Sequence, residues 1–323
     1  AGPTTRDATI NASTSAASAA LSRQTDFDIA CMNGSAPNRY ALTMRVITTV
    51  PRLLLCIALW AAVAQASDAP RRVVSFNLCA DQLVIALADP EQIAGLSPYA
   101  TDPALSVVAD KARAFRKADW QAESTLLLEP DLVLIGPNDR SVTRRMLASQ
   151  GLRVVETGFV SDLDSARKQI REIATLLGHK ERGEKLIAEL ERARLRLASA
   201  ATKGDRTALV VERGGYTQGP SSLAATLLAE AGLKPPTGAP AGYGGFIPLE
   251  RFLVLRPDLV FLKDPPSAAT DQGAMFLVHP ALRDLYPPER RVALPTRYTM
   301  CGGPALVAAF DYMADEMVRL PAP

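Results

Sequence analysis

Two stretches of the chain follow the same pattern. Residues 123–133 read ESTLLLEPDLV, and residues 250–260 read ERFLVLRPDLV. In both, a glutamate precedes a proline by seven residues, and Pro-Asp-Leu-Val opens an apolar run. Proline ends helices, and a short, continuously apolar run is typical of a strand buried on both faces of a sheet. Each copy therefore predicts a short helix followed by a buried strand, and the repetition predicts two equivalent lobes.

Strand and helix patterns alternate in both halves of the chain. Apolar and β-branched runs predict strands at 71–77, 93–97, 131–136 and 153–156, and again at 207–212, 258–263 and 292–294. Helical patterns lie between them, beginning at Ala80 and covering 141–150, 221–232 and 304–320. This alternation is typical of α/β units on parallel sheets. We therefore predict an α/β protein with two lobes, mostly parallel sheets and a ligand cleft between the lobes.

The stretch from Asp162 to Ala201 breaks the alternation, because it is helical in pattern almost throughout and free of proline. Gly178 and Gly183 are positions at which it can divide into two helices. Its second part is highly charged, and a helix of about 20 residues is about 30 Å long. We expect this part to cross between the lobes as a stiff backbone helix. The alternative is a helix packed on one sheet with a solvated charged face.

A tripartite export signal precedes the predicted lobes. From Met44 the chain has a basic segment, an apolar stretch over residues 53–63 and the sequence Ala64-Gln65-Ala66. This is the order found in cleavable signal peptides, and the apolar stretch is too short to span a bilayer. We expect residues 44–66 to be removed and the mature, periplasmic chain to begin at Ser67.

The remaining parts of the chain differ in composition and charge. Residues 1–43 are rich in Ala, Ser and Thr, so we expect a disordered leader or a gene-model extension. The mature chain then consists of a first lobe at 67–161, a helical linker at 162–203 that includes the backbone helix, and a second lobe at 204–323. The full chain has 36 Lys and Arg against 34 Asp and Glu, and loss of residues 1–66 leaves 31 of each. A mature chain without net charge does not indicate a nucleic-acid partner.

Three segments resemble the substrate-binding proteins of ABC importers for iron complexes and cobalamin, and the resemblance covers essentially all of residues 71–320. They are RRVVSFNLCADQLVIALADPEQIAGLSPYATDP at 71–103, the paired E-x6-PDLV repeats, and TRYTMCGGPALVAAF at 296–310. The sequences SPYATD and Asp119-Trp120-Gln121 are similar to the cobalamin-binding member. The resemblance implies two α/β lobes held by a long backbone helix, with a ligand in the cleft between them.

The resemblance also implies partners. In this family each lobe offers a glutamate to arginines of a membrane-embedded permease dimer, and Glu123 and Glu250 match those positions. A pseudo-twofold pair suits a twofold partner; the alternative is that both glutamates stabilise helix N-termini. We expect a monomer that carries a small metal chelate, such as a corrinoid, a ferric siderophore or haem. The cobalt or iron belongs to the ligand, and no cofactor of the protein's own is expected.

Residues for catalysis or metal binding are scarce in this sequence. The two histidines, His179 and His279, lie 100 residues apart, whereas a catalytic triad or a zinc site needs side chains that converge. We therefore expect neither an enzyme nor a protein-held metal. Two alternatives from other classes are a chelatase-like enzyme of the same architecture and an extracytoplasmic ligand sensor. The sensor is disfavoured because no membrane span follows Leu320.

Candidate ligand-binding residues follow the predicted strands, because ligands of parallel α/β sheets bind at the carboxyl ends of strands. The first lobe offers Asn77, Cys79, Tyr99 and Trp120, and the second offers Arg213, Tyr216, Tyr243, Arg297 and Tyr298. Aromatic rings suit the flat face of a macrocycle or chelate, and arginines suit propionate, phosphate or catecholate oxygens. The neutral charge and the SPYATD segment favour a corrinoid among the three ligand classes.

Two of the four cysteines remain in the mature chain, Cys79 and Cys301. Three interpretations stay open for them: a disulfide, two free thiols, or soft ligands to a bound metal. Disulfides persist outside the cytoplasm, which favours the first. A disulfide needs Cα atoms within about 7 Å of each other, and it would tie the lobes together at the cleft.

Overall fold

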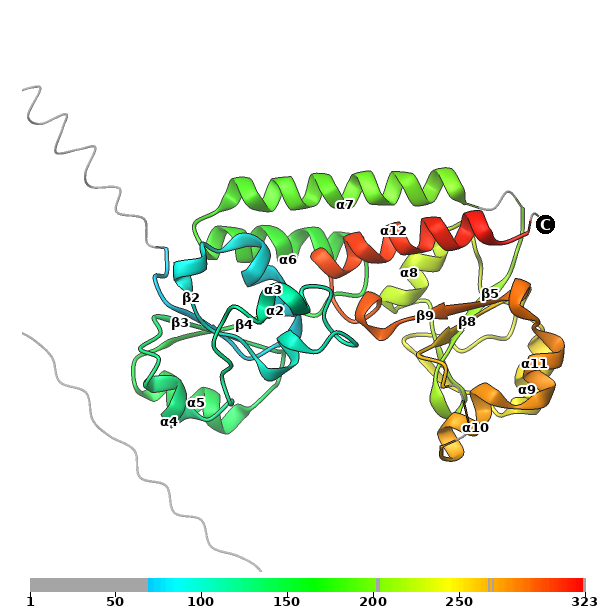
Figure 1. Cartoon of the computed structure of the whole chain (residues 1–323), viewed down its shortest axis with the longest axis horizontal. Coiled ribbons are helices and arrows are strands. Elements are labelled where there is room, and N and C mark those ends of the chain that lie inside the picture. Colours follow the sequence, from blue (N-terminus) through cyan, green and yellow to red (C-terminus); the bar gives the residue numbers. More distant parts are fainter. Residues whose placement is uncertain (1–68, 202–203, 267, 269, 322–323) are drawn as a thin grey trace, which may run out of the picture. The chain divides into compact units, whose positions relative to one another are not determined.

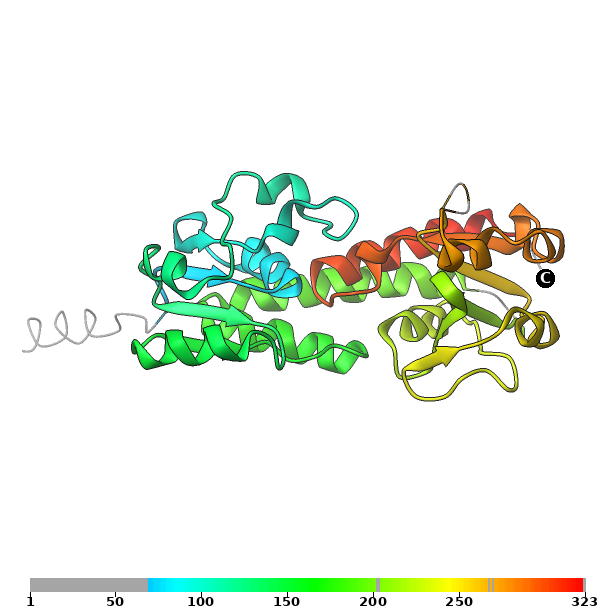
Figure 2. The ribbon, with the colours of Figure 1, turned by 90° about the horizontal axis from the view of Figure 1, so that it is seen from below.

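The computed structural model describes residues 69–201, 204–266, 268 and 270–321. Ser67–Pro323 form one compact unit, which contains two sheets joined by helices (Figures 1 and 2). The predicted leader and signal peptide, residues 1–66, lie outside the described residues. Within the described part, no helix is both long and apolar enough to span a membrane.

The first sheet has four parallel strands in the order β2-β1-β3-β4. Alternate residues of its central strands pack into two different apolar clusters, so both faces of this sheet are covered. The strands are β1 (Val73–Ser75), β2 (Ile93–Gly95), β3 (Leu132–Ile135) and β4 (Arg153–Glu156). The helices of this lobe are α2 (Leu78–Leu87), α3 (Ala109–Ala112), α4 (Ala122–Leu126) and α5 (Ser141–Ser149).

Strand β1 is shorter than the predicted strand over residues 71–77. The backbone N–H groups of Arg71 and Arg72 donate to the carboxylate of Asp131, so they do not enter the ladder. At the other end, the side chain of Asn77 accepts hydrogen bonds from the backbone of the first turn of α2 and serves as its N-cap. At both ends of the predicted strand, backbone N–H groups therefore bond to side chains instead of to a neighbouring strand.

The second sheet is mixed, with the order β7-β6-β5-β8-β9. Strands β5, β8 and β9 are parallel, as predicted, whereas β6 and β7 are antiparallel additions at one edge that the sequence did not predict. Both are three residues long, YTQ and GGF, so neither shows the alternation of apolar and polar residues that indicates a strand. The strands are β5 (Ala208–Val211), β6 (Tyr216–Gln218), β7 (Gly244–Phe246), β8 (Leu259–Lys263) and β9 (Arg291–Leu294).

The helices of the second half surround this sheet (Figure 1). Helix α9 immediately precedes β8, just as α4 immediately precedes β3, so both copies of the repeated segment form a short helix and then a buried strand. This confirms the prediction of two equivalent α/β lobes. The helices are α8 (Leu223–Glu230), α9 (Leu249–Leu255), α10 (Gln272–Val278), α11 (Pro280–Leu285) and α12 (Pro304–Arg319).

The predicted helical stretch forms two helices, α6 (Leu163–Leu176) and α7 (Lys180–Ala200). The break falls at Gly178, whose φ of +84° suits glycine and ends α6. Gly183, the second predicted break, lies inside α7. A Cβ there would meet the Cβ of Ala174 at 2.5 Å, so this glycine allows α7 to lie close against α6.

Helix α7 crosses between the lobes, and ion pairs fix it to the elements beneath it. Arg182 pairs with Asp89 of the first lobe, and Arg194 pairs with Glu230 of α8 in the second. Helix α12 crosses beside α7 in the same direction (Figure 1): it begins where Gly303 meets Leu83. One apolar cluster continues from the first sheet through α6, α7 and α12 to the second sheet. The sequence predicted a single crossing helix, and the structure has two.

Candidate functional site

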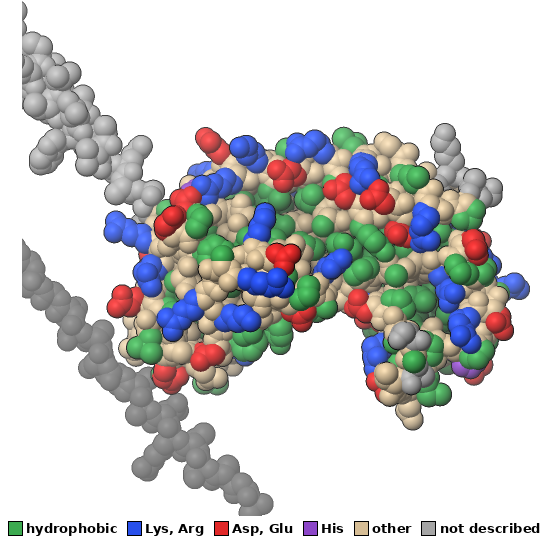
Figure 3. Space-filling model, viewed as in Figure 1, with side chains coloured by type: hydrophobic (Ala, Val, Ile, Leu, Met, Phe, Trp, Pro, Cys, Tyr) green, Lys and Arg blue, Asp and Glu red, His purple; other side chains and the backbone are tan. Residues whose placement is uncertain are grey.

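The carboxyl ends of the strands in the two lobes face each other. Figure 3 shows a hollow between the lobes on the side of the unit away from α7. The segment after β4 meets the second lobe through Phe159, whose ring lies 6.2 Å from that of Tyr243. The hydroxyl of Thr226 donates to the carbonyl of Ser161 at 3.2 Å. The segment after β4 thus contacts the second lobe beside Tyr243 and at α8.

The first lobe contributes an aromatic and cationic surface. Tyr99 is 46% exposed, and its ring centroid lies 5.2 Å from that of Trp120. The guanidinium of Arg140 lies 4.2 Å from the same ring centroid. Trp120 has a φ of +66°, and a bulky residue with this backbone is uncommon and typical of functional sites. Its indole N–H donates to the carbonyl of Phe76 at 3.0 Å, which fixes the ring.

The second lobe contributes a matching set of aromatic residues from β6, β7 and the loop between them. The ring of Tyr216 lies 5.2 Å from that of Phe246, edge to face, and its hydroxyl donates to the carbonyl of Tyr243 at 3.3 Å. Tyr243 and Phe246 are 59% and 75% exposed. These rings leave much of their surface open to a ligand.

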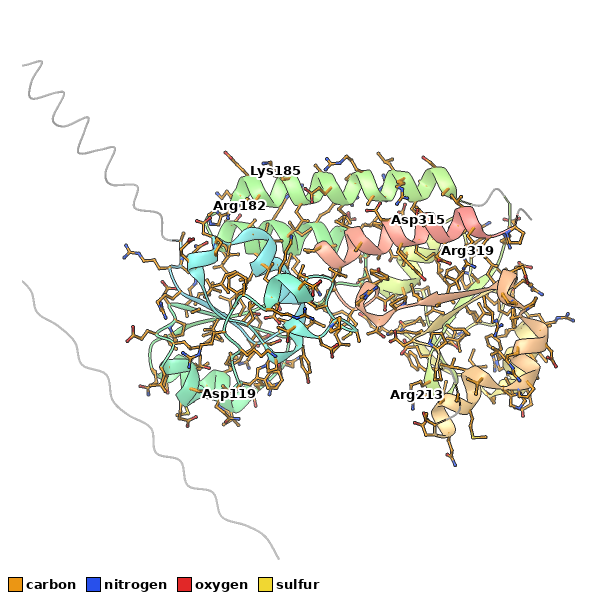
Figure 4. All side chains as sticks on the ribbon, in the orientation of Figure 1. Asp119, Arg182, Lys185, Arg213, Asp315 and Arg319 are labelled. Carbon is orange, nitrogen blue, oxygen red and sulfur yellow. A yellow bond between two sulfur atoms is a disulfide. The ribbon has the colours of Figure 1, made fainter. Side chains whose placement is uncertain are left out.

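Arg213 lies on the side of the second lobe that faces the first (Figure 4). Its guanidinium pairs with the carboxylate of Asp271, which caps helix α10. The pKa of Asp271 is lowered, first by the backbone N–H of Ala274 and then by Arg213. The Arg213 side chain is 50% exposed, and a guanidinium suits oxygen anions of a ligand.

Three of the predicted residues have structural partners of their own. The side-chain oxygen of Asn77 is used as the cap of α2. Arg297 donates to the carbonyl of Pro103 in the first lobe at 3.2 Å, and the ring of Tyr298 stacks on Tyr312 at 4.9 Å. Arg297 and Tyr298 line a cavity of about 280 Å³ with Pro103 at the seam between the lobes.

Cys79 and Cys301 form a disulfide in the structure, with Cα atoms 5.1 Å apart. Cys79 follows β1 and Cys301 follows β9, so the bond joins the segments after strands of the two lobes. Cys301 is buried with Leu78 and Ala305 in a small apolar cluster. Sulfur atoms paired in this way are not available as thiolate ligands to a metal.

A buried carboxyl group supports the loop that carries Tyr99. Asp81 of α2 is fully buried and accepts hydrogen bonds from the backbone N–H of Ser97 at 3.1 Å and from its hydroxyl at 2.5 Å. Burial raises the pKa of Asp81 to about 7, although hydrogen bonds from Ser75 and Ser97 act against the increase. Ser97 immediately precedes the turn that contains Tyr99, so Asp81 anchors the base of that turn.

Both histidines have structural partners apart from the aromatic residues described above. His179 precedes α7 and contacts Gln92 and Asp89, and His279 caps α11 through a bond from Ala281. Among the described residues, no group of three His, Cys, Asp or Glu side chains is arranged to hold a metal ion.

Sequence reasoning missed three residues of this site: Arg140, Phe159 and Phe246. Arg140 follows β3 and Phe159 follows β4, so the rule that selected the other residues also selects these two. Phe246 ends an antiparallel strand of two glycines and one aromatic residue, and no pattern in the sequence indicated that strand.

Comparison with known proteins agrees with this architecture. Residues 73–284 match the model of the periplasmic binding protein family. The chain belongs to this family. Family membership implies a binding protein that acts outside the cytoplasm, and it is in this family that two-lobed α/β structures of the kind described here occur.

The individual proteins that the chain resembles share little sequence identity with it. The chain is 26% identical over 166 residues to a cobalamin-binding protein of Halobacterium salinarum, which covers 50% of this chain and 45% of that protein. The chain thus matches less than half the length of that relative. The heme-binding protein RhuT from Roseiflexus sp. RS-1, in apo form, is similar with a TM-score of 0.63 and 21% identity, covering 77% of this chain and 98% of that one. The vitamin B12 binding protein BtuF of Vibrio cholerae has a TM-score of 0.57 and 16% identity, covering 77% and 96%.

Proposed function

We propose that this protein is the extracytoplasmic substrate-binding component of an ABC importer and that it captures a metal chelate in the hollow between its lobes. The proposal is supported by two groups of exposed aromatic residues, one in each lobe. Tyr99 packs on Trp120 in the first lobe, and Tyr216 packs on Phe246 in the second, where Tyr243 is also exposed. Exposed rings on two opposed surfaces suit a large, flat and partly apolar ligand. The predicted signal peptide would deliver the chain to the periplasm.

A corrinoid is the ligand that we propose first, with haem and a ferric siderophore as the other members of the class. The relative from Halobacterium salinarum carries a cobalamin-binding name, and the aromatic surfaces suit the faces of a corrin ring. We propose that Arg140 and Arg213 pair with carboxylate or phosphate oxygens at the ligand's rim. The metal arrives inside the ligand, and the residues described here hold its periphery.

Direct titration tests the ligand class. We expect cyanocobalamin, followed by equilibrium dialysis and its visible absorbance, to bind one to one with a Kd at or below about 1 μM, a value typical of a pre-formed site. Haemin and a ferric hydroxamate, measured in the same way, rank the alternatives. Replacing both Tyr99 and Phe246 with Ala should weaken binding of the preferred ligand by about 100-fold, because two exposed aromatic contacts are lost. Val142→Ala, at an exposed position on α5, is the control; absence of binding by all three chelates would contradict the proposal.

We also propose that Glu123 and Glu250 dock the protein on the permease. Both side chains are exposed, and they occupy the same position in the two copies of the repeated segment. Replacing both with Ala should reduce uptake of the chelate at least tenfold and leave its Kd nearly unchanged, since rim charges act on association with a partner rather than on a distant pocket. Glu181→Ala with Glu189→Ala removes two exposed glutamates from α7 as a matched control. A large loss of chelate affinity in the Glu123/Glu250 variant would place these residues in the ligand site instead.

A further inference from the structure

The most exposed aliphatic side chains of the two lobes occupy equivalent positions. Leu127 and Val254 are each 80% exposed. Leu127 lies four residues after Glu123, and Val254 lies four residues after Glu250. Residues separated by four positions lie on the same side of a helix, so each lobe presents a carboxylate beside an aliphatic side chain. We call these two surfaces the first and second Glu–aliphatic pairs.

The segments that follow the two pairs share two features. A left-handed residue occurs at the same position of each repeat, Glu129 with φ +47° and Arg256 with φ +42°. Two residues later, Asp131 and Asp258 each accept a hydrogen bond from a backbone N–H at the start of the neighbouring strand segment. The helices differ in length, so Leu127 is the C-cap of α4 whereas Val254 lies within α9.

Neither aliphatic side chain is needed for the core of its lobe. The residues that α4 and α9 bury are Ala122 and Thr125 in one and Phe252 in the other. In the described part of the chain, the carboxylates of Glu123 and Glu250 form no hydrogen bond or ion pair. In Figure 1, α4 lies at the lower edge of the first lobe, and α9 lies at the outer end of the second lobe beside α11, both away from α7.

We propose that each lobe docks through its whole Glu–aliphatic pair, so that Leu127 and Val254 are contact residues alongside Glu123 and Glu250. The partner is an integral-membrane protein with two equivalent sites, each a cationic side chain beside an apolar pocket. This inference rests on the proposed function, because the permease dimer is that partner. Burial of an aliphatic side chain strengthens binding by about tenfold or more, and it adds shape recognition that a single exposed charge lacks.

Binding to the reconstituted permease in lipid nanodiscs tests the proposal, with matched controls. Leu127→Ser with Val254→Ser should raise the Kd for the permease by about 100-fold and leave the Kd for cyanocobalamin unchanged. Leu195→Ser with Val318→Ser is the control, because these residues are a leucine on α7 and a valine on α12 with 55% and 77% exposure. A photo-crosslinking amino acid at position 127 or 254 should label the permease subunits, and one at position 195 or 318 should not.

The outcomes separate this inference from the proposed function. If the Glu123/Glu250 variant loses permease binding and the Leu127/Val254 variant does not, the permease docking stands and the aliphatic contact is wrong. Equal crosslinking from all four positions also overturns the aliphatic contact. If the unmodified protein does not bind the permease at all, the proposed function fails, and the inference fails with it.

Discussion

Replacing Cys79 and Cys301 together with Ser is expected to lower the free energy of unfolding by about 3–5 kcal/mol. The disulfide joins residues separated by 222 positions, so it closes a very long loop in the unfolded chain. The chain-entropy model gives about 5 kcal/mol for a loop of this size, and measured values are usually smaller. Because the bond links the segments after β1 and β9, its loss should also loosen the contact between the two lobes.

Urea denaturation of the unmodified protein and the double-Ser variant measures this effect. Treatment of the unmodified protein with dithiothreitol should lower its stability to that of the variant, whereas the variant should not respond. Titration of thiols in denatured, unreduced protein gives an independent check, and two reactive thiols per mature chain would contradict the disulfide. Equal stability of variant and unmodified protein would show that the long loop is already restricted in the unfolded state.

Asp81→Asn is expected to change how stability depends on pH. The pKa of Asp81 is raised from 3.8 to about 7 in the folded protein, mainly by burial. Between these values the folded state binds a proton that the unfolded state has released, so stability is highest at low pH and falls as pH rises toward and past 7. At about 1.4 kcal/mol per pKa unit, this group accounts for a loss of up to about 4 kcal/mol between pH 4 and pH 8.

The difference in unfolding free energy between the Asp81→Asn variant and the unmodified protein isolates this effect, because other titrating groups cancel. We expect the variant to gain relative stability steadily from pH 4 to pH 8. Asp284→Asn, at an exposed carboxyl group on α11, is the control. A constant difference for Asp81→Asn would mean that the Asp81 carboxyl is ionised throughout this range.

Much of the fold could be predicted from local patterns because its parallel strands are buried on both faces. The runs around Val133 and Val260 are continuously apolar and follow a proline, which indicated strands in both lobes. The edge strands β6 and β7 were not predictable in this way, since a sequence such as GGF gains its strand geometry from pairing with a neighbour rather than from its own residues. The second crossing helix was recognised as a helix, but its path depends on tertiary packing.

One rule predicted the candidate site: ligands of parallel α/β sheets bind at the carboxyl ends of the strands. Arg213, which follows β5, lies on the side of its lobe that faces the first lobe (Figure 4), and for Tyr99 a place at the hollow stays a prediction. The rule does not say which side chain is already engaged: Asn77 caps a helix, and Arg297 binds a carbonyl of the other lobe. The cap of Asn77 is local, formed with Cys79 and Ala80, whereas the partner of Arg297 is Pro103, 194 residues away, and only the folded arrangement reveals that contact.

The position of α12 has a consequence for how the chain reaches its native state. Residues 304–319 follow both sheets in the sequence, yet they pack against α2 and complete the apolar cluster that begins at Val73. A growing chain therefore exposes part of the first lobe's interior until the last of its helices has been made. Contacts between such distant segments slow folding, and they make the two lobes a single cooperative unit. We therefore expect a fragment that ends before α12 to expose part of this cluster and to be degraded more readily than the full chain.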